Sequence, residues 1–286
     1  MKKNTILLSA FAAAAIMTPA SAATVAYWNA SAGANQKTLT DLAGGDHNLA
    51  SPSTKFSASG VNVAPNPVPN PDALTTGGSG SIFINSGTAA SVSSGDFEMT
   101  SSSSFTFEGW VQIQTGGGGV IAGDRHQSNG YDGWYLVASA NKLQFYANTG
   151  GAVGNSVTST ADIVTATTAT DGFHHFAAVW DHDTGAGNVG TMSLYIDGVL
   201  QGTVDHDVVD YNSNTFGLAG RDAGTSGSAL VDGLLTAGSR LDELRFSDQA
   251  LAPSQFLNAV PVPEPSVAAL IGLAGLGVLL MRRRRN

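Results

Sequence analysis

Histidines and carboxylates are the residues of this sequence best suited to chemistry, and several of them are chain neighbours. His174 and His175 are adjacent, as are Asp242 and Glu243. Neighbouring residues of a β-strand point to opposite faces of the sheet, so neither pair can converge on one metal ion, proton or sugar. We expect one histidine inside the fold and the other on an outer face, and we predict no catalytic pair at Asp242 and Glu243.

Other patterns that support catalysis or ligand binding are weak. The sequence has no cysteine, which excludes thiolate zinc sites and a cysteine nucleophile. It has no Gly-x-Ser-x-Gly motif for a serine nucleophile. The Asp-His-Asp triplets at 181–183 and 205–207 resemble metal ligands on paper, but we interpret both as solvated acidic turns between strands. The sequence therefore predicts no catalytic residue.

Aromatic side chains are the other candidates, because tyrosine and tryptophan rings can stack on sugars. Aromatic residues in alternating strands more often belong to a core, and we expect that role for each of them. The candidates are Trp110, Trp134, Tyr135, Tyr146 and Trp180.

Short strands joined by turns must position these residues. Residues 105–113 alternate cleanly, with Phe105 and Phe107 on one face and Thr106 and Glu108 on the other. Asp197-Gly198 is typical of a tight hairpin. With no helical periodicity between strands, the chain is predicted to be an all-β antiparallel sandwich or barrel. Further strands are expected at 24–28, 81–84, 134–137, 143–146, 173–180, 192–196 and 241–246, with one or two helical turns at 252–257.

Both ends of the chain read as targeting segments. Residues 1–22 have the charged start, short apolar stretch and Ala20-Ser21-Ala22 site of a secretory signal peptide cut by signal peptidase. Residues 261–286 begin with Val-Pro-Glu-Pro and continue as an apolar run that predicts a transmembrane helix, with an arginine cluster on the cytoplasmic side. We expect export from the cytoplasm.

The charge of the middle segment limits its partners. Six of the 13 basic residues lie in the two end segments, so residues 23–265 carry seven bases against 22 acids, a formal charge of −15. Nucleic-acid affinity comes mainly from Lys and Arg against phosphates, so a nucleic-acid partner is excluded. The composition suits an extracellular surface or one that collects divalent cations.

The C-terminal segment resembles the PEP-CTERM sorting signal of Gram-negative bacteria. The resemblance implies recognition by the membrane transpeptidase exosortase, transient inner-membrane anchoring, removal of the tail, and delivery to the cell surface or extracellular polysaccharide matrix. An ordinary single-span anchor is the alternative. The residues that carry the resemblance are Pro263, Glu264, Pro265, Arg282, Arg283, Arg284 and Arg285.

Residues 23–260 resemble a LamG-like jelly-roll domain of the concanavalin A-like lectin and glucanase group. The matching segments are Phe-Thr-Phe-Glu-Gly-Trp-Val at 105–111, Gly-Trp-Tyr-Leu at 133–136, Phe-His-His-Phe-Ala at 173–177, Leu-Tyr-Ile-Asp-Gly at 194–198 and Leu-Asp-Glu-Leu-Arg-Phe at 241–246. The resemblance implies two antiparallel sheets packed face to face, with the closing strand beside the first. It also implies that Asp41 and Asp242 can share a structural calcium ion.

The same resemblance bears on activity. Glycoside hydrolases of this broad fold carry Glu and Asp at alternating positions of one strand, and none of the glutamates of the mature chain begins such a pattern. We therefore expect a non-enzymatic surface module that binds a glycan or a protein. A divergent glycoside hydrolase or lyase and a purely structural matrix protein are the alternatives. The glutamates concerned are Glu98, Glu108, Glu243 and Glu264.

Overall fold

The computed structural model describes residues 22–28, 38–50, 56–59, 81–84, 90–92, 94–113, 116–126, 132–148, 154–163, 173–182, 189–207, 215–220, 234–236 and 239–259. The predicted sorting tail, and the signal peptide up to residue 21, lie outside these ranges. Within the described ranges, no helix is long and apolar enough to cross a membrane.

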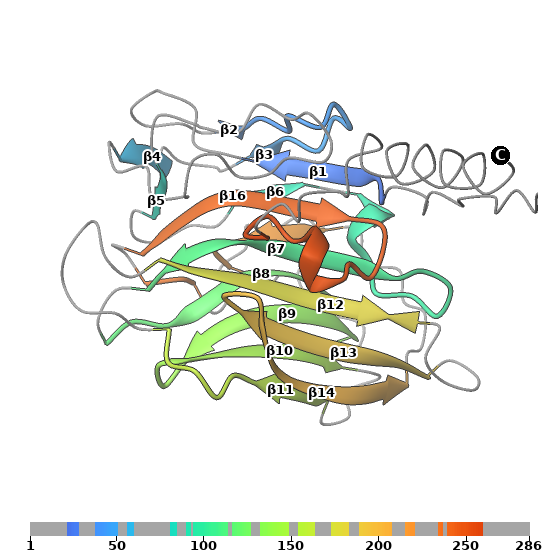
Figure 1. Ribbon diagram of the computed structural model, residues 1–286. Helices are drawn as coiled ribbons and strands as arrows, with labels where there is room; N and C mark the ends of the chain where they lie inside the picture. Colours follow the sequence, from blue (N-terminus) through green and yellow to red (C-terminus); the bar gives the residue numbers. More distant parts are fainter. Residues whose placement is uncertain are drawn as a thin grey trace, which may run out of the picture.

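Two eight-stranded antiparallel sheets pack face to face, which confirms the predicted all-β sandwich (Figure 1). The first sheet has the order β14 (Val199–Asp207), β13 (Val189–Ile196), β12 (His174–Asp181), β7 (Phe105–Gln112), β16 (Arg240–Ser247), β5 (Ser81–Ile84) and β4 (Phe56–Ser59), with β1 (Thr24–Trp28) also paired to β16. The second has the order β11 (Asn155–Thr158), β10 (Lys142–Asn148), β9 (Asp132–Ser139), β8 (Gly119–His126), β15 (Phe216–Leu218), β6 (Ala90–Val92), β3 (Leu49–Ala50) and β2 (Thr38–Leu39).

Alternation along the strands fills the space between the sheets. In β7, Phe105 and Phe107 belong to the main buried cluster, while Thr106 and Glu108 lie on the opposite face, as predicted. Aromatic rings from both sheets meet in this core, and Phe107 lies 5.9 Å from Trp134 between ring centroids. Large buried rings contribute most of the hydrophobic stabilisation of such a core.

The pairing of β1 with β16 brings the first and last strands together, as the resemblance implied. A β-bulge interrupts β16 between Asp242 and Arg245, and Glu243 takes a positive φ of 48° there. Gly109 of β7 faces the bulge: a Cβ on this residue would lie 2.7 Å from a methyl carbon of Leu244. Glycine at 109 therefore leaves the space that Leu244 fills.

After β16 the chain crosses the outer face of the first sheet, and we call residues 249–259 the strap. It contains the 3-10 turn η3 (Pro253–Gln255), within the stretch predicted to form helical turns, and appears in orange-red in Figure 1. Leu251 and Phe256 pack against Ala177 and Val179 of β12, on the face away from the core. Thr106 of β7 fixes the start of the strap by donating to the carbonyl of residue 249 at 2.7 Å.

Candidate functional site

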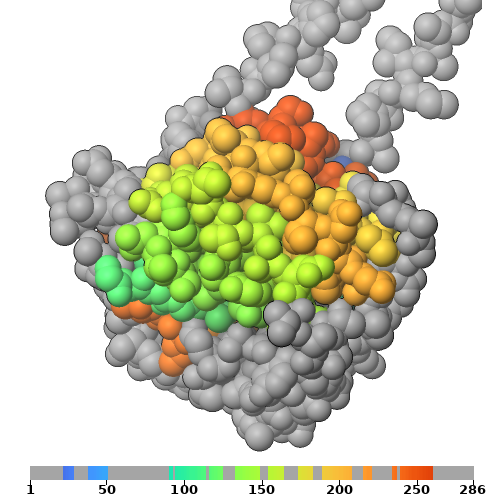
Figure 2. All heavy atoms as spheres, turned by 90° about the horizontal axis from the view of Figure 1, so that it is seen from below, coloured from blue at the N-terminus to red at the C-terminus, as the bar shows by residue number. Residues whose placement is uncertain are grey.

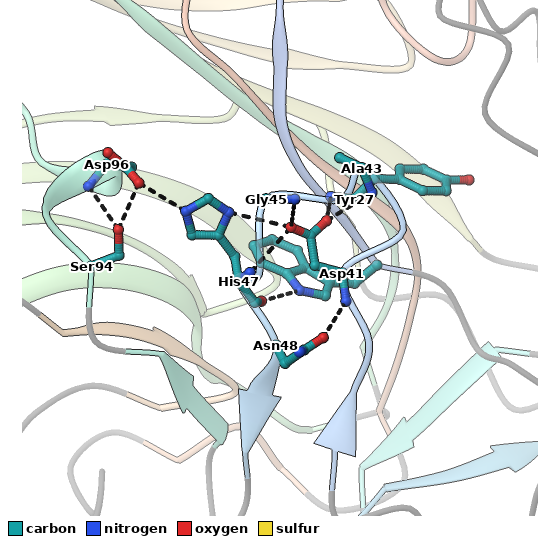
Figure 3. Close-up of polar contacts among 9 residues, drawn as sticks. Tyr27, Asp41, Ala43, Gly45, His47, Asn48, Ser94 and Asp96 are labelled. Atoms are coloured by element: carbon teal, nitrogen blue, oxygen red, sulfur yellow. Dashed lines mark hydrogen bonds and ion pairs between the residues drawn. The ribbon is translucent and has the colours of Figure 1, made fainter.

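Asp41 organises the loop between β2 and β3 (Figure 3). Its Oδ1 accepts from the amides of Tyr27 and Ala43, at 3.0 and 2.9 Å. Its Oδ2 accepts from the amides of Gly45 and His47, at 3.1 and 3.2 Å, and lies 3.3 Å from His47 Nδ1. A carboxylate offers about four lone-pair sites, so these five contacts occupy Asp41 fully.

His47 links that loop to the short turn η1 (Gly95–Phe97). Its Nε2 lies 2.8 Å from Asp96 Oδ2, and the same oxygen accepts from the Ser94 hydroxyl at 2.8 Å. The hydrogen bonds from His47 and then Ser94 lower the pKa of Asp96 below its usual range. The cluster joins the two sheets' N-terminal segments, and its polar atoms bond to one another instead of pointing toward a ligand.

Asp242 lies opposite Trp110 on the outer face of the first sheet and is 1% exposed. One of its oxygens accepts from the Glu243 amide at 3.0 Å, whereas Oδ2 has no hydrogen-bond partner. Burial raises the pKa of Asp242 to about 7, against the opposing effect of the Glu243 amide. A buried carboxylate with one unsatisfied oxygen is costly unless a proton or a cation joins it.

The shared calcium site of Asp41 and Asp242 stays a prediction. The two residues have no hydrogen-bond partner in common, and an ion at Asp41 would have to displace some of its donors. Across the ranges that the structure describes, no group of three or more His, Asp and Glu side chains is placed to hold a metal ion. Of the two proposed ligands, Asp242 has the oxygen better able to accept one.

A fully buried ionic cluster centres on Glu108 beneath the strap. Its Oε1 accepts from Arg245 Nε at 2.8 Å and from Arg245 Nη2, while Oε2 accepts from the Leu257 amide at 2.8 Å and lies 3.0 Å from His175 Nε2. Burial alone would raise the pKa of Glu108, but the Arg245 charge and the His175 hydrogen bond outweigh it, so the pKa is lowered. Because all of its lone pairs are used, Glu108 holds the strap and has no free oxygen for catalysis.

The two adjacent histidines diverge as predicted, but their placement differs from the prediction. The fully buried His175 is on the outer face, under the strap, with its ring edge-on to Trp110 at 5.3 Å. His174 begins β12, on the same side of the strand as the core residue Phe176, and stays partly exposed, with its Nδ1 2.8 Å from Asp197 Oδ2. The fully buried histidine of the pair is thus the one on the outer face, because the strap, which sequence alternation does not reveal, covers that face.

The triplet at 205–207 is not a turn, which corrects the prediction. It lies within β14, and His206 is buried with its ring 6.5 Å from Trp180. Burial lowers the pKa of His206, against the opposing charge of Asp207. In the other triplet, Asp181 ends β12 and His182 Nδ1 lies 2.8 Å from Ser104 Oγ, while residue 183 is outside the described ranges.

The structure separates the five candidate aromatic residues into three groups. Trp134 and Trp180 are fully buried in the core, as predicted. Trp110 is 8% exposed and lies on the outer face of the first sheet, beside the buried His175. Tyr135 and Tyr146 are only half-buried, because they alternate with the core residues of β9 and β10 and so face away from the core.

Tyr135 and Tyr146 lie directly opposite each other in the β9–β10 pairing, with rings stacked at 4.9 Å and 6°. On the neighbouring strands, Gly123 of β8 pairs with Tyr135 and Ser156 of β11 pairs with Tyr146. Their side chains are too small to cover a ring. The Tyr146 hydroxyl donates a hydrogen bond to Gln144 Oε1 at 3.1 Å. Together with their outward-facing strand neighbours these residues form what we call the tyrosine face: Tyr135, Val137, Gln144, Tyr146, Ser156 and Thr158.

The tyrosine face contains no carboxylate: the outward-facing residues described on β9, β10 and β11 include no Asp or Glu. The view from below shows the yellow-green residues of β10 and β11 separated from the orange-red strap by β13 and β14, in orange (Figure 2). The tyrosine face and the strap thus belong to the outer faces of different sheets. A solvent-facing aromatic pair with neutral polar neighbours is suited to binding and lacks the paired acids that glycoside hydrolysis needs.

Several solved structures share the fold. The binding domain of Paraclostridial Mosquitocidal Protein 1 matches with a TM-score of 0.51 and 13% identity, over 81% of this chain and 50% of that one. The botulinum neurotoxin serotype D binding domain matches with a TM-score of 0.50 and 13% identity, over 82% and 50%. The same ligand-binding domain in complex with N-acetylneuraminic acid gives 0.50 and 12%, over 82% and 49%.

The chain therefore spans about half the length of these binding domains. No curated protein matches it in sequence. Residues 85–255 match the family model described as the concanavalin A-like lectin/glucanases superfamily, which covers more than half of the chain. The chain belongs to the concanavalin A-like lectin/glucanase superfamily.

Proposed function

We propose that this protein is a non-enzymatic, exported module that binds a glycan through the tyrosine face. The observation that carries the proposal is the stacked, half-buried pair of Tyr135 and Tyr146 on an outer sheet face without carboxylates. The faces of aromatic rings carry negative quadrupole charge, which attracts the C–H groups on one side of a pyranose ring. Paired amide and hydroxyl groups beside the rings supply hydrogen bonds to sugar hydroxyls.

Two observations favour binding over hydrolysis. The carboxylates of Asp41 and Glu108 are saturated with hydrogen bonds, and Asp242 is buried. The superfamily includes both lectins and glucanases, so the family alone does not choose between them. The solved neighbours are binding domains, and one of them is in complex with N-acetylneuraminic acid, so a sandwich of this kind can present a sugar site.

The expected sorting signal suggests how the module would be displayed. The strap ends four residues before Pro263, a span of at most about 14 Å when extended. A tail attached there would hold the outer face of the first sheet toward the membrane or matrix anchor. The tyrosine face belongs to the other sheet and would point away from it. Exosortase processing and delivery to the cell surface or matrix are part of the proposal.

A glycan array probed with the full-length protein tests the binding function directly. We expect binding to a subset of glycans, with no release of reducing sugar on prolonged incubation. Parallel runs with calcium and with chelator separate a calcium effect from the tyrosine face. Absence of binding to every glycan of the array and to the exopolysaccharide of the producing cells would contradict glycan binding. Steady cleavage of a bound glycan would favour the hydrolase alternative.

A further inference from the structure

The polar groups of the tyrosine face form one uncharged hydrogen-bonded chain. Tyr146 donates to Gln144 Oε1 at 3.1 Å, and Gln144 Nε2 donates to Thr158 Oγ1 at 3.3 Å. These two hydrogen bonds fix the orientation of the Gln144 amide, because a flipped amide would lose both of them. The chain leaves one amide hydrogen, the Thr158 hydroxyl hydrogen and phenol lone pairs for a ligand. All of these are neutral partners that match sugar hydroxyls.

The lysine and arginine side chains that the structure describes are Lys142, Arg240 and Arg245, and each of them has a partner. Lys142 lies at the start of β10, on the same side as Gln144 and Tyr146, and pairs with Asp162 Oδ1 at 2.7 Å. Arg245 is buried against Glu108, and Arg240 donates to Gln112 Oε1 at 3.4 Å. An anionic sugar at this face would have to compete with Asp162 for Lys142, and the chain as a whole carries a formal charge of −9.

Stacking and charge thus point to the same kind of ligand. The two parallel rings offer aromatic surface beside Gly123 and Ser156, and the hydrogen-bonding groups beside them carry no charge. We infer that the tyrosine face selects a neutral polysaccharide and discriminates against uronic, sialic or sulfated ones. The inference rests on the proposed glycan-binding function and specifies the chemical class of its ligand.

Matched polysaccharide pairs test this selectivity in affinity gels with the full-length protein. The pairs are hydroxyethyl cellulose with carboxymethyl cellulose, and dextran with dextran sulfate. We expect retardation by at least one neutral member, at least about tenfold weaker binding of its anionic partner, and little change between about 0.05 and 0.5 M salt. Equal or stronger binding of the anionic member, or strong salt dependence, would overturn the inference and leave glycan binding standing. Absence of binding to every member, to the glycan array and to the exopolysaccharide would overturn both.

Variants assign any binding to the face itself. Tyr135→Ala with Tyr146→Ala should weaken neutral binding at least about tenfold, because the stacking surface is lost. Thr158→Lys adds a cation at an exposed position of the same face and should improve binding of the anionic partner. Thr203→Ala, at an exposed position of β14, is the matched control and should change neither. Unchanged binding in the double tyrosine variant, with its melting temperature preserved, would place the glycan elsewhere.

Discussion

The outer faces of the two sheets differ in what covers them and in how they use polar groups. On the first sheet the strap buries an ionic cluster in which Glu108 joins Arg245, His175 and the backbone of the strap. On the second sheet the tyrosine face stays half-exposed and carries no acid among its described residues. The residues that appear most reactive in the sequence are therefore committed to the fold, while neutral aromatic residues are available for a ligand.

The two faces also differ in what a mutation should remove. Loss of one partner from a buried ionic cluster leaves the other charge without compensation, so the variant loses stability. Loss of a half-exposed ring removes little core contact, so the cost appears as binding. We therefore expect mutations beneath the strap to lower stability and mutations on the tyrosine face to weaken binding.

The largest effect is expected at Glu108. Glu108→Gln would leave the Arg245 guanidinium buried beside a neutral group and should lower the free energy of unfolding by about 3–5 kcal/mol, measured by urea denaturation. Since the pKa of Glu108 is lowered in the fold, its contribution is present above its usual pKa of 4.5 and is lost as pH falls through the folded value. The wild type should thus lose this advantage over the variant in acid. A change below about 1 kcal/mol at neutral pH would mean that the cluster does not hold the strap.

Asp242 should show the opposite pH dependence. Its folded-state pKa of about 7 lies above the usual 3.8, so its contribution to stability is present below about pH 4 and is lost as pH rises through 7. Asp242→Asn should therefore stabilise the protein at pH 8, on the order of 2–4 kcal/mol, and flatten stability between pH 4 and 8. Urea titrations across that range measure it. A variant that is less stable than the wild type at pH 8 would show that the ionised carboxylate has a partner.

Calcium is expected to have a smaller effect. An ion at Asp242 would satisfy the unpartnered oxygen but would compete with the amides around Asp41. We expect millimolar calcium to raise the melting temperature by roughly 2–4 °C relative to chelator, the shift that about 1 kcal/mol gives in a domain of this size. Asp242→Ala should abolish the difference. A melting temperature that does not depend on calcium in the wild type would end this proposal.

The strands of the core could be predicted wherever alternation and burial coincide. Residues 24–28 and 105–112 form strands as expected, and Asp197 and Gly198 both adopt the positive φ that the hairpin requires. The two- and three-residue strands β2, β3, β6 and β15 are not predicted, because so few residues show no alternation. The strands β4, β8, β11 and β14 are not predicted either, and in β8 a register shift between Val120 and Ala122 interrupts the alternation.

The candidate site was predictable only in part. The sequence singled out Tyr135 and Tyr146 but could not tell them from Trp134 or Trp180, since aromatic residues occur on both faces of the strands. Alternation along the strand distinguishes the outward-facing tyrosines from the core residues: Tyr135 lies between the buried Trp134 and Leu136. The role of Glu108 was not predictable, because its partners come from β16, β12 and the strap, up to 149 residues away.

One matched comparison of tyrosines tests the difference between the faces most directly. Tyr195 lies on the first sheet against the strap, with its ring 5.1 Å from Phe256, and Tyr146 lies on the tyrosine face. The measurement is the affinity of the full-length protein for a neutral polysaccharide, together with the melting temperature, for Tyr146→Ala and Tyr195→Ala. We predict that Tyr146→Ala loses binding with its melting temperature nearly unchanged, and that Tyr195→Ala melts lower and keeps wild-type affinity. Retained binding in Tyr146→Ala, or binding lost in a folded Tyr195→Ala, would contradict the account.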